Sequence, residues 1–296
     1  MEIFLSQLFI GLSVASILLL VALGLTFTFG QMNVINMAHG EFLMAGAYTT
    51  YLVQGALGTS LVTLGFLVAL PVAFLVGGAL GVVLEWALIR RLKGRPLDTL
   101  LATFGVSLVL QQLARDIFGA ANVQLTAPPF LDGAITVAGV SMSYTRLFII
   151  GLVGVALVAI WAHLGRSPAG RRMRAVMQNR DLAAASGVRT PRVDRATFFI
   201  GSGLAGVAGV AVTLLGSIGP TLGTSYLIDA FLVVIVGGLG RLRGAIMAAV
   251  ALGVVNAYVE YGTDASIAKA AVFALIVVFL QFRPQGLVVQ RARGLA

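Results

Sequence analysis

The sequence contains no cysteine and only two histidines among its 296 residues. Without cysteine, the chain can form neither a disulfide nor a thiolate metal site. His39 and Glu41 have the H-x-E spacing of zinc deaminases, but such a site also needs cysteine ligands. His163 stands near the end of an apolar segment, and no H-E-x-x-H motif occurs. The sequence therefore argues against a metal site.

Two other signatures of enzymes are missing. No Gly-Lys dipeptide occurs, so the chain has no phosphate-binding P-loop and cannot hydrolyse ATP by that route. The pairs Gly77-Gly78 and Gly237-Gly238 lie in apolar segments, where glycine serves helix packing more than dinucleotide binding. Because no catalytic cluster can be assembled, we expect a chain that is not an enzyme and binds no cofactor of its own.

Charge is also scarce. Only 10% of the residues are charged and 59% are hydrophobic, whereas soluble domains carry roughly 25% charged residues. This composition predicts an all-α, polytopic membrane protein, with residues 1–296 forming one transmembrane domain. We expect eight or nine transmembrane helices, some of them broken or re-entrant. The apolar segments are 8–30, 33–55, 61–89, 99–118, 144–163, 196–217, 226–239, 244–260 and 266–282.

Some of these segments are interrupted. Residues 33–55 hold Asn33, Asn36, His39 and Glu41, which predicts a broken or re-entrant helix packed against protein. Two further segments depart from a regular span. Residues 61–89 would overshoot the bilayer without a kink or tilt, and residues 226–239 are short for a span.

Pro71 offers the kink in residues 61–89. After the span at 196–217, residues 218–225 read as a turn, and residues 119–143 read as a loop without basic residues. Within residues 196–217, four small residues predict close helix–helix contacts. They are Gly201, Gly203, Gly206 and Gly209.

The net charge of +9 indicates orientation in a membrane more than nucleic-acid binding, because the basic residues stand at the ends of apolar segments. If the clusters at 90–95, 166–195, 241–243 and the C-terminal tail are cytoplasmic, 17 of the 20 basic residues lie inside. This places the N-terminus outside and the C-terminus in the cytoplasm. The first apolar segment lacks a basic flank and a cleavage site, so we expect a retained helix.

Polar residues at membrane depth are the candidates for a substrate pathway. An Asp at the centre of a transmembrane helix costs roughly 2.5–3.5 kcal/mol on insertion scales, so such residues face a cavity, a pathway or each other. Tying helices together is the alternative role. The predicted pathway residues are Asn36, His39, Glu41, Tyr48, Tyr226, Asp229 and Asn256. For Glu85, we expect an interfacial ion pair with Arg90 or Arg91, one turn further on.

The stretch from Arg166 to Arg195 carries eight arginines and two aspartates, and we expect a cytoplasmic loop at about 164–195. Its pattern predicts an amphipathic helix from Gly170 to Ser186, ended by Gly187. Such a helix could rest on anionic lipid or dock in a groove of a partner protein. The run of small residues at 183–187 favours contact with a protein.

Several motifs together resemble one family. INMAHGEFLMAGAY (35–48), AVMQNRDLAAASGV (175–188), VVIVGGLGRLRGA (233–245) and QFRPQGL (281–287) are similar to motifs of the permease subunits of branched-chain amino acid ABC transporters. GPTLGTSYLIDAF (219–231) resembles the urea-type subfamily more than the amino-acid type. Asp181 departs from the family, many members of which have Glu before the alanines.

The resemblance implies an importer subunit in the bacterial inner membrane. Two ATP-binding subunits would supply energy and bind the ATP, a periplasmic substrate-binding protein would deliver substrate, and a homologous second permease would pair with this chain. The loop residues matched to the ATPase-coupling motif are Asn179, Arg180, Asp181, Leu182, Ala183, Ala184 and Gly187.

The expected substrate is urea or a closely related small amide. A carboxylate such as Asp229 or Glu41 could accept two N–H groups of urea, and Asn36, Tyr226 or His39 could donate to its carbonyl. A branched-chain amino acid permease of the same family is the alternative. A channel or secondary transporter that works alone is a less favoured reading.

Overall fold

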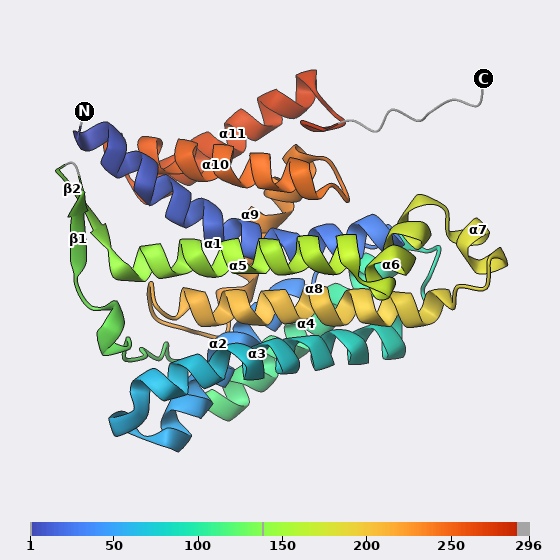
Figure 1. Ribbon diagram of the computed structural model, residues 1–296, viewed down its shortest axis with the longest axis horizontal. Helices are drawn as coiled ribbons and strands as arrows, with labels where there is room; N and C mark the ends of the chain where they lie inside the picture. The colour runs from blue at the N-terminus through green and yellow to red at the C-terminus, as the bar shows by residue number, and fades with distance from the viewer. Residues whose placement is uncertain (1, 138, 289–296) are drawn as a thin grey trace.

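The computed structural model describes residues 2–137 and 139–288, and this part of the chain is an α-helical bundle with one β-hairpin (Figure 1). The helices are α1 (Glu2–Met32), α2 (His39–Leu57), α3 (Val62–Leu84), α4 (Pro96–Phe118), α5 (Tyr144–Arg166), α6 (Pro168–Gln178), α7 (Arg180–Ala185), α8 (Thr190–Val212), α9 (Leu222–Gly237), α10 (Leu242–Gly262) and α11 (Ala265–Phe282). The hairpin pairs β1 (Ala134–Val137) with β2 (Val140–Ser143) in antiparallel register. The last basic residues of the tail, Arg291 and Arg293, lie outside the described residues.

Seven helices are long and apolar enough to cross a membrane: α1, α3, α4, α5, α8, α10 and α11. The two other long apolar segments became α2 and α9, which fall outside that set. Each of the nine apolar segments of the sequence thus overlaps one of these nine helices, which confirms an all-α polytopic architecture. The hairpin lies inside residues 119–143, which the sequence analysis treated as a loop, and α9 begins at Leu222, inside the expected turn.

The glycines of α8 are the reason that this helix can lie at the centre. A methyl group on Gly201 would lie 2.8 Å from the carbonyl oxygen of Gly24 in α1. One on Gly206 would collide with the backbone of Ala73 in α3. Backbones can approach this closely only where side chains are absent. The close contacts predicted from these glycines are therefore confirmed.

Two parts of the bundle are arranged alike but run in opposite directions. In each, a long buried helix (α1 or α8) leads through a non-helical segment into a short helix (α2 or α9) and then a longer one (α3 or α10) (Figure 1). Helix α1 packs on α10, and α8 packs on α3, through glycines in both cases. The sequence itself shows no clear repeat.

The short helices α2 and α9 begin inside the bundle and meet there. A methyl group on Gly40 would collide with the carbonyl of Gly223, and one on Gly223 would collide with that of Gly40. The first turns of both helices therefore touch through main chain alone. Because the unpaired N–H groups of a helix start carry partial positive charge, this junction favours a nearby carboxylate.

Helix α3 continues through Pro71 and ends in a π-helical segment, Glu85–Ile89. Glu85 is almost completely buried, and its ion-pair partner is Arg195 of α8, with 3.7 Å between Oε2 and Nε. The expected pairing with Arg90 or Arg91 was wrong. The reason is that the π segment turns Glu85 toward α8, away from the following arginines.

Candidate functional site

The extended segment between α1 and α2 is held by side chains. Asn33 has a left-handed backbone, with φ 52°. The side-chain oxygen of Asn36 accepts a hydrogen bond from Ala38 N at 3.0 Å. Met37 N donates to Thr103 Oγ1 of α4 at 3.1 Å. The predicted break in residues 33–55 is therefore present, and the buried Asn36 shapes it.

His39 starts α2 and is fully buried. Its Nε2 lies 3.2 Å from the carbonyl oxygen of Val21, near the middle of α1. Gly24 provides the space, because a methyl group there would lie 2.7 Å from His39 Cε1. This contact joins α2 to α1. The predicted pathway role of His39 stays a prediction.

Glu41 lies two residues further along α2, beside the junction of α2 and α9. Its Oε1 accepts hydrogen bonds from Ser107 Oγ at 2.8 Å, Gln111 Nε2 at 2.9 Å and Thr224 Oγ1 at 3.4 Å. The side chain is fully buried. Glu41 thus connects α2 with α4 and α9, and the starts of two helices favour its negative charge.

The donors to Glu41 carry a signal that the sequence analysis missed. From Thr99 to Gln111, every fourth residue of α4 is polar and buried, and these residues share one face of the helix. They are Thr99, Thr103, Ser107 and Gln111. Four polar residues at this spacing in an apolar segment indicate a face turned toward protein and polar groups.

Tyr48 belongs to the same contact between α2 and α4. Its ring stacks on Phe118 with 4.1 Å between centroids, and it is almost completely buried. Tyr48 therefore lies with Glu41 and not with the remaining pathway candidates.

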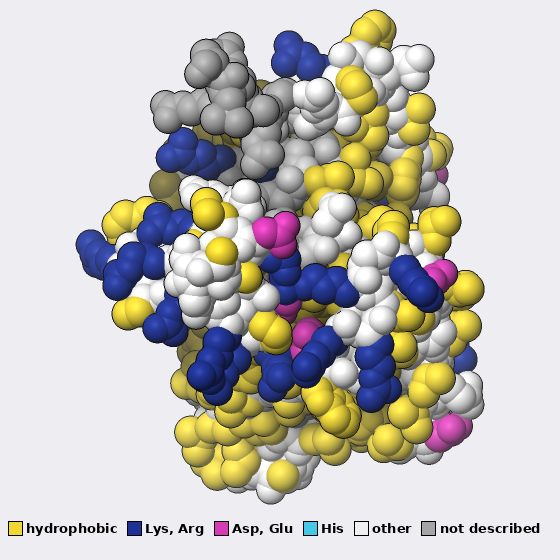
Figure 2. Space-filling model, turned by 90° about the vertical axis from the view of Figure 1, so that its right-hand side faces the viewer, with side chains coloured by type: hydrophobic (Ala, Val, Ile, Leu, Met, Phe, Trp, Pro, Cys, Tyr) yellow, Lys and Arg dark blue, Asp and Glu magenta, His cyan; other side chains and the backbone are white. Residues whose placement is uncertain are grey.

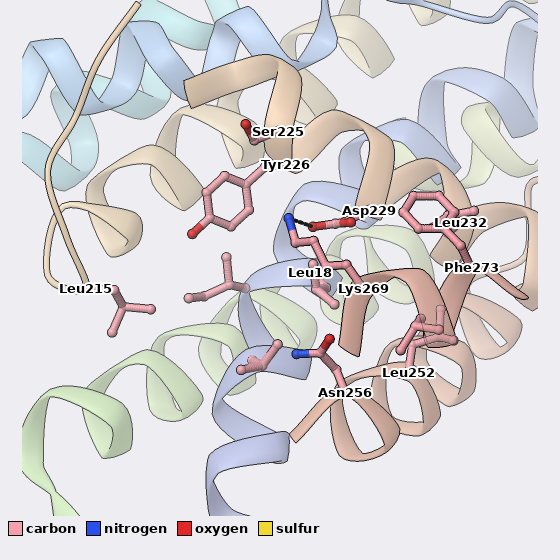
Figure 3. Close-up of a pocket in the computed structure, with 13 residues that line it drawn as sticks. Leu18, Leu215, Ser225, Tyr226, Asp229, Leu232, Leu252, Asn256, Lys269 and Phe273 are labelled. Carbon is pink, nitrogen blue, oxygen red and sulfur yellow. Dashed lines mark ion pairs between the residues drawn. The ribbon is translucent and has the colours of Figure 1, made fainter. Parts of the chain in front are cut away.

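Those remaining candidates meet in a cavity of about 270 Å³ between α1, α9, α10 and α11 (Figure 3). Tyr226 and Asp229 come from α9, and Asn256 comes from α10. The described residues that line the cavity are Val14, Ile17, Leu18, Leu215, Ser225, Tyr226, Asp229, Leu232, Leu252, Asn256, Lys269, Val272 and Phe273. Three of the seven predicted pathway residues thus share one site, whereas Glu41 belongs to another.

Lys269 of α11 completes the polar part of this cavity. Its Nζ lies 3.6 Å from Asp229 Oδ2, and the Lys269 and Asp229 side chains are 57% and 24% exposed. Asn256 Nδ2 donates to Glu260 at 3.3 Å. In the sequence, Lys269 is one of the three basic residues outside the predicted cytoplasmic clusters. Its pairing with Asp229, forty positions away, depends on the packing of α11 beside α9.

The opposite end of the bundle is basic. Figure 2 shows Lys and Arg side chains spread across the end where α6 and α7 project. The loop at 90–95 and the loop around Arg241 also face this end, because Lys93 contacts α8 near its start and Arg241 lies beside Arg174 and Met177 of the α6 region. The described basic clusters therefore gather as the positive-inside pattern predicts.

The predicted single helix from Gly170 to Ser186 was wrong. The chain forms α6 and α7, separated at Asn179, which has an extended backbone (φ −156°, ψ 108°). Asn179 Oδ1 accepts a hydrogen bond from Leu182 N at 2.9 Å and so caps α7. Asparagine is among the preferred N-cap residues, so this break had a sequence signal.

The break turns Arg180 inward. Both Nη atoms of Arg180 bind the carboxylate of Asp194 in α8, with 3.0 Å between Nη1 and Oδ1. Lys93 Nζ lies 3.3 Å from Asp194 Oδ2, and Gln31 Nε2 of α1 donates to Oδ1 at 3.1 Å. Thr197 hydrogen bonds to Gln31 in turn. We call Asp194, Arg180, Lys93, Gln31 and Thr197 the Asp194 cluster.

The predicted coupling residues divide into two groups. Ala183 is buried against Met173, Val176 and Val193, and Arg180 is engaged with Asp194. The others point outward, and Leu182 is 66% exposed. They are Asn179, Asp181, Leu182, Ala184 and Gly187. Gly187 has φ +85° with open space where a side chain would be.

Over residues 2–137 and 139–288, no group of three or more His, Asp or Glu side chains could hold an ion. What the chain offers is a buried polar junction, a cavity with one charge of each sign, and a basic end with an exposed short helix.

Comparison with known proteins gives the family. The model of the family described as "Branched-chain amino acid transport system / permease component" matches residues 7–280. The high-affinity branched-chain amino acid transport system permease protein BraD of Pseudomonas aeruginosa is 30% identical over 292 residues, covering 96% of this chain and 95% of that protein.

A second relative, the high-affinity branched-chain amino acid transport system permease protein LivH of Escherichia coli K12, is 31% identical over 304 residues, again covering 96% and 95%. A probable branched-chain amino acid transport permease protein LivH of Methanocaldococcus jannaschii is 27% identical and covers 83% of this chain and 78% of its own. No solved structure gives a significant match. With the match extending over nearly all of the described helices, the chain belongs to the family of permease components of branched-chain amino acid transport systems.

Proposed function

We propose that this chain is the membrane subunit of an ATP-driven importer whose substrates are branched-chain amino acids. The supporting observation is the similarity over 96% of the chain to permeases that are named for this transport. The urea reading depended on the pattern at residues 219–231 and finds no support in these relatives. Branched-chain amino acids, the alternative in the sequence analysis, are therefore the preferred substrates.

The proposal includes partners and an orientation. This chain lacks a P-loop, so ATP hydrolysis would take place on two ATP-binding subunits. A periplasmic substrate-binding protein would deliver the amino acid, and a homologous second permease would complete the membrane part. The basic end would face the cytoplasm, with the N-terminus outside, because basic loops remain on the cytoplasmic side.

The exposed face of α7 would receive the movement of the ATPase. Leu182 is exposed at the tip, while Ala183 and Arg180 on the other face fix α7 to α6 and α8. A push on α7 would therefore reach α8, the central helix, through Asp194. Positive charge would suit a loop that only rests on lipid equally well. A bulky side chain on the exposed face of α7, in contrast, should block docking to an ATPase and leave a lipid anchor intact.

Uptake measurements test the substrate. A strain without its own leucine and urea importers would receive this permease with its companion permease, ATPases and binding protein. We expect uptake of radiolabelled leucine and none of urea, and no uptake of either when the ATPases carry an inactivating substitution. Urea uptake without leucine uptake would instead identify urea as the substrate. Leucine transport by the permease alone in liposomes would indicate a transporter that works without an ATPase.

Substitutions at Gly187 test the coupling face. A Cβ atom added at Gly187 would have no atom of this chain within 4 Å, so we expect Gly187→Trp to insert normally in the membrane but to lose leucine uptake. Gly187→Ala is the matched control, because it carries the same left-handed backbone strain, roughly 1–2 kcal/mol, without the bulk. Arg192→Gln removes an exposed charge nearby, and we expect a mild effect. Equal loss from all three would contradict docking at this face.

A further inference from the structure

We propose that the cavity between α1, α9, α10 and α11 binds the transported amino acid as a zwitterion. Asp229 would bind the α-ammonium group, Lys269 would bind the α-carboxylate, and the apolar walls would hold the branched side chain. This inference rests on the proposed function and assigns to it a binding site within this chain.

The charged pair leaves room for a ligand. Its N–O distance of 3.6 Å exceeds the roughly 2.7–2.9 Å of a charge-assisted hydrogen bond. Lys269 has three N–H donors and Asp229 has two acceptor oxygens, so a single loose contact leaves most of their capacity unused. Over the described residues, Lys269 is the only cation that pairs with Asp229. Figure 3 shows both side chains in the same space as Tyr226 and Asn256.

The rest of the cavity is suited to an aliphatic side chain. Leu18 of α1, Leu232 of α9 and Leu252 of α10 line it together with Val272 and Phe273 of α11. The volume of about 270 Å³ lies just below the roughly 300–1,000 Å³ of sites for drug-sized ligands, so a molecule of amino-acid size is appropriate. One charge of each sign beside an apolar wall matches the two ends of leucine, isoleucine or valine.

Charge and place distinguish this ligand from others. A neutral amide needs neither a full positive nor a full negative partner, and a simple anion or cation would use only one of the two. The cavity also lies toward the end of the bundle where α8 ends and α11 begins, opposite the basic end. In the proposed orientation this is the outer half, where the binding protein would release its amino acid.

The absence of cysteine provides a direct test. Ser225→Cys places one thiol in the cavity wall, and Ala120→Cys places one at an exposed position outside the cavity as the control. In the assembled importer in lipid nanodiscs, a hydrophilic maleimide would label either thiol. We expect leucine at ten times its Kd to slow labelling of Ser225→Cys about tenfold and to leave Ala120→Cys unchanged.

Ligand analogues and isosteric variants test the charges. Isopentylamine lacks the carboxylate and 4-methylpentanoate lacks the ammonium, and we expect neither to protect at the same concentration. Asp229→Asn and Lys269→Gln, each combined with Ser225→Cys, should abolish protection by leucine. Size-exclusion profiles and leucine-independent ATPase activity would verify that these variants assemble.

The outcomes separate this inference from the proposed function. If the importer takes up leucine but leucine does not protect Ser225→Cys, or protects it equally in both charge variants, the cavity is not the site and the function stands. If Ala120→Cys is labelled and Ser225→Cys is not, the cavity is closed to solutes and the inference fails. If the importer takes up urea and not leucine, the proposed function fails first.

Discussion

Asp194 and Asp229 are both paired with basic residues, yet their surroundings differ in nearly every respect. Asp194 is almost completely buried and binds Arg180, Lys93 and Gln31 at once. Asp229 is part-exposed and has Lys269 at 3.6 Å beside a cavity. The first carboxylate is fully used by the protein, and the second has capacity left for something else.

Burial and the number of partners distinguish a carboxylate that holds the fold together from one that is available to a ligand. A buried carboxylate must have its partners supplied by the fold, because an unpaired charge there is strongly destabilising. A part-exposed pair with a long N–O contact contributes less to stability. We therefore expect substitutions at the two sites to separate stability from transport, and three charge pairs give a graded test.

The largest effect is expected for Asp194→Ala. The change leaves Arg180 and Lys93 without their common partner and should lower the free energy of unfolding by about 3–5 kcal/mol. Thermal unfolding in detergent, followed by the fluorescence of Trp86 and Trp161, measures the loss. Asp181→Ala removes an exposed acid from α7 and serves as the control. A change in the control as large as that in Asp194→Ala would mean that the cluster is not the cause.

Arg180→Ala should have an intermediate effect. It removes two charge-assisted hydrogen bonds to Asp194, each of a kind that contributes about 1.5–3 kcal/mol, but Lys93 and Gln31 remain. We expect a loss in unfolding free energy smaller than for Asp194→Ala and a weaker coupling of ATP hydrolysis to leucine uptake. The measurement is the ratio of ATP hydrolysed to leucine imported. Arg192→Ala, at an exposed position in α8, should leave this ratio unchanged.

Unlike Asp194→Ala, Asp229→Asn should reduce transport much more than stability. Because the pair of Asp229 with Lys269 is part-exposed, we expect the unfolding free energy to change by less than about 1 kcal/mol. Leucine uptake should fall strongly. The same fluorescence melt and radiolabelled uptake give both numbers on one preparation. If Asp229→Asn unfolds at a clearly lower temperature and still transports leucine, Asp229 has a structural role like that of Asp194.

The smallest effect is expected for Arg95→Gln. Arg95 and Asp98 form a surface pair at 3.8 Å, with side chains 73% and 56% exposed. Such pairs contribute well under about 1 kcal/mol, so neither unfolding nor uptake should change measurably. This variant gives the smallest changes in unfolding free energy and uptake with which the Asp229→Asn results are compared. A destabilisation comparable to that of Arg180→Ala would show that exposure does not rank these pairs.

The sequence was sufficient for the features that depend on one segment at a time. Apolar length located nine helices, the glycines of α8 indicated its close contacts, and the asparagines before His39 indicated the break ahead of α2. These signals are local, because hydrophobicity, side-chain size and capping act within a few residues. The sequence even selected three residues that share a cavity, Tyr226, Asp229 and Asn256.

What the sequence could not supply was the partner of each polar residue. Glu85 binds Arg195, 110 positions away, in preference to the nearby Arg90, and Asp229 binds Lys269. Such pairs exist only after the helices have packed. The break at Asn179 is a different case: its capping signal was present, but the regular amphipathic pattern around it predicted a continuous helix.

The non-helical segments ahead of α2 and α9 find their hydrogen-bond partners at different stages of synthesis. Backbone groups inside a bilayer need partners, since lipid offers none. Met37 N in the first segment finds its partner in Thr103, 66 positions later in the chain. Ile218 in the second pairs with Val123, which has already been made. The hydrogen bond of the first segment can therefore form only after α4 has been synthesised, whereas the partner of the second segment precedes it in the chain.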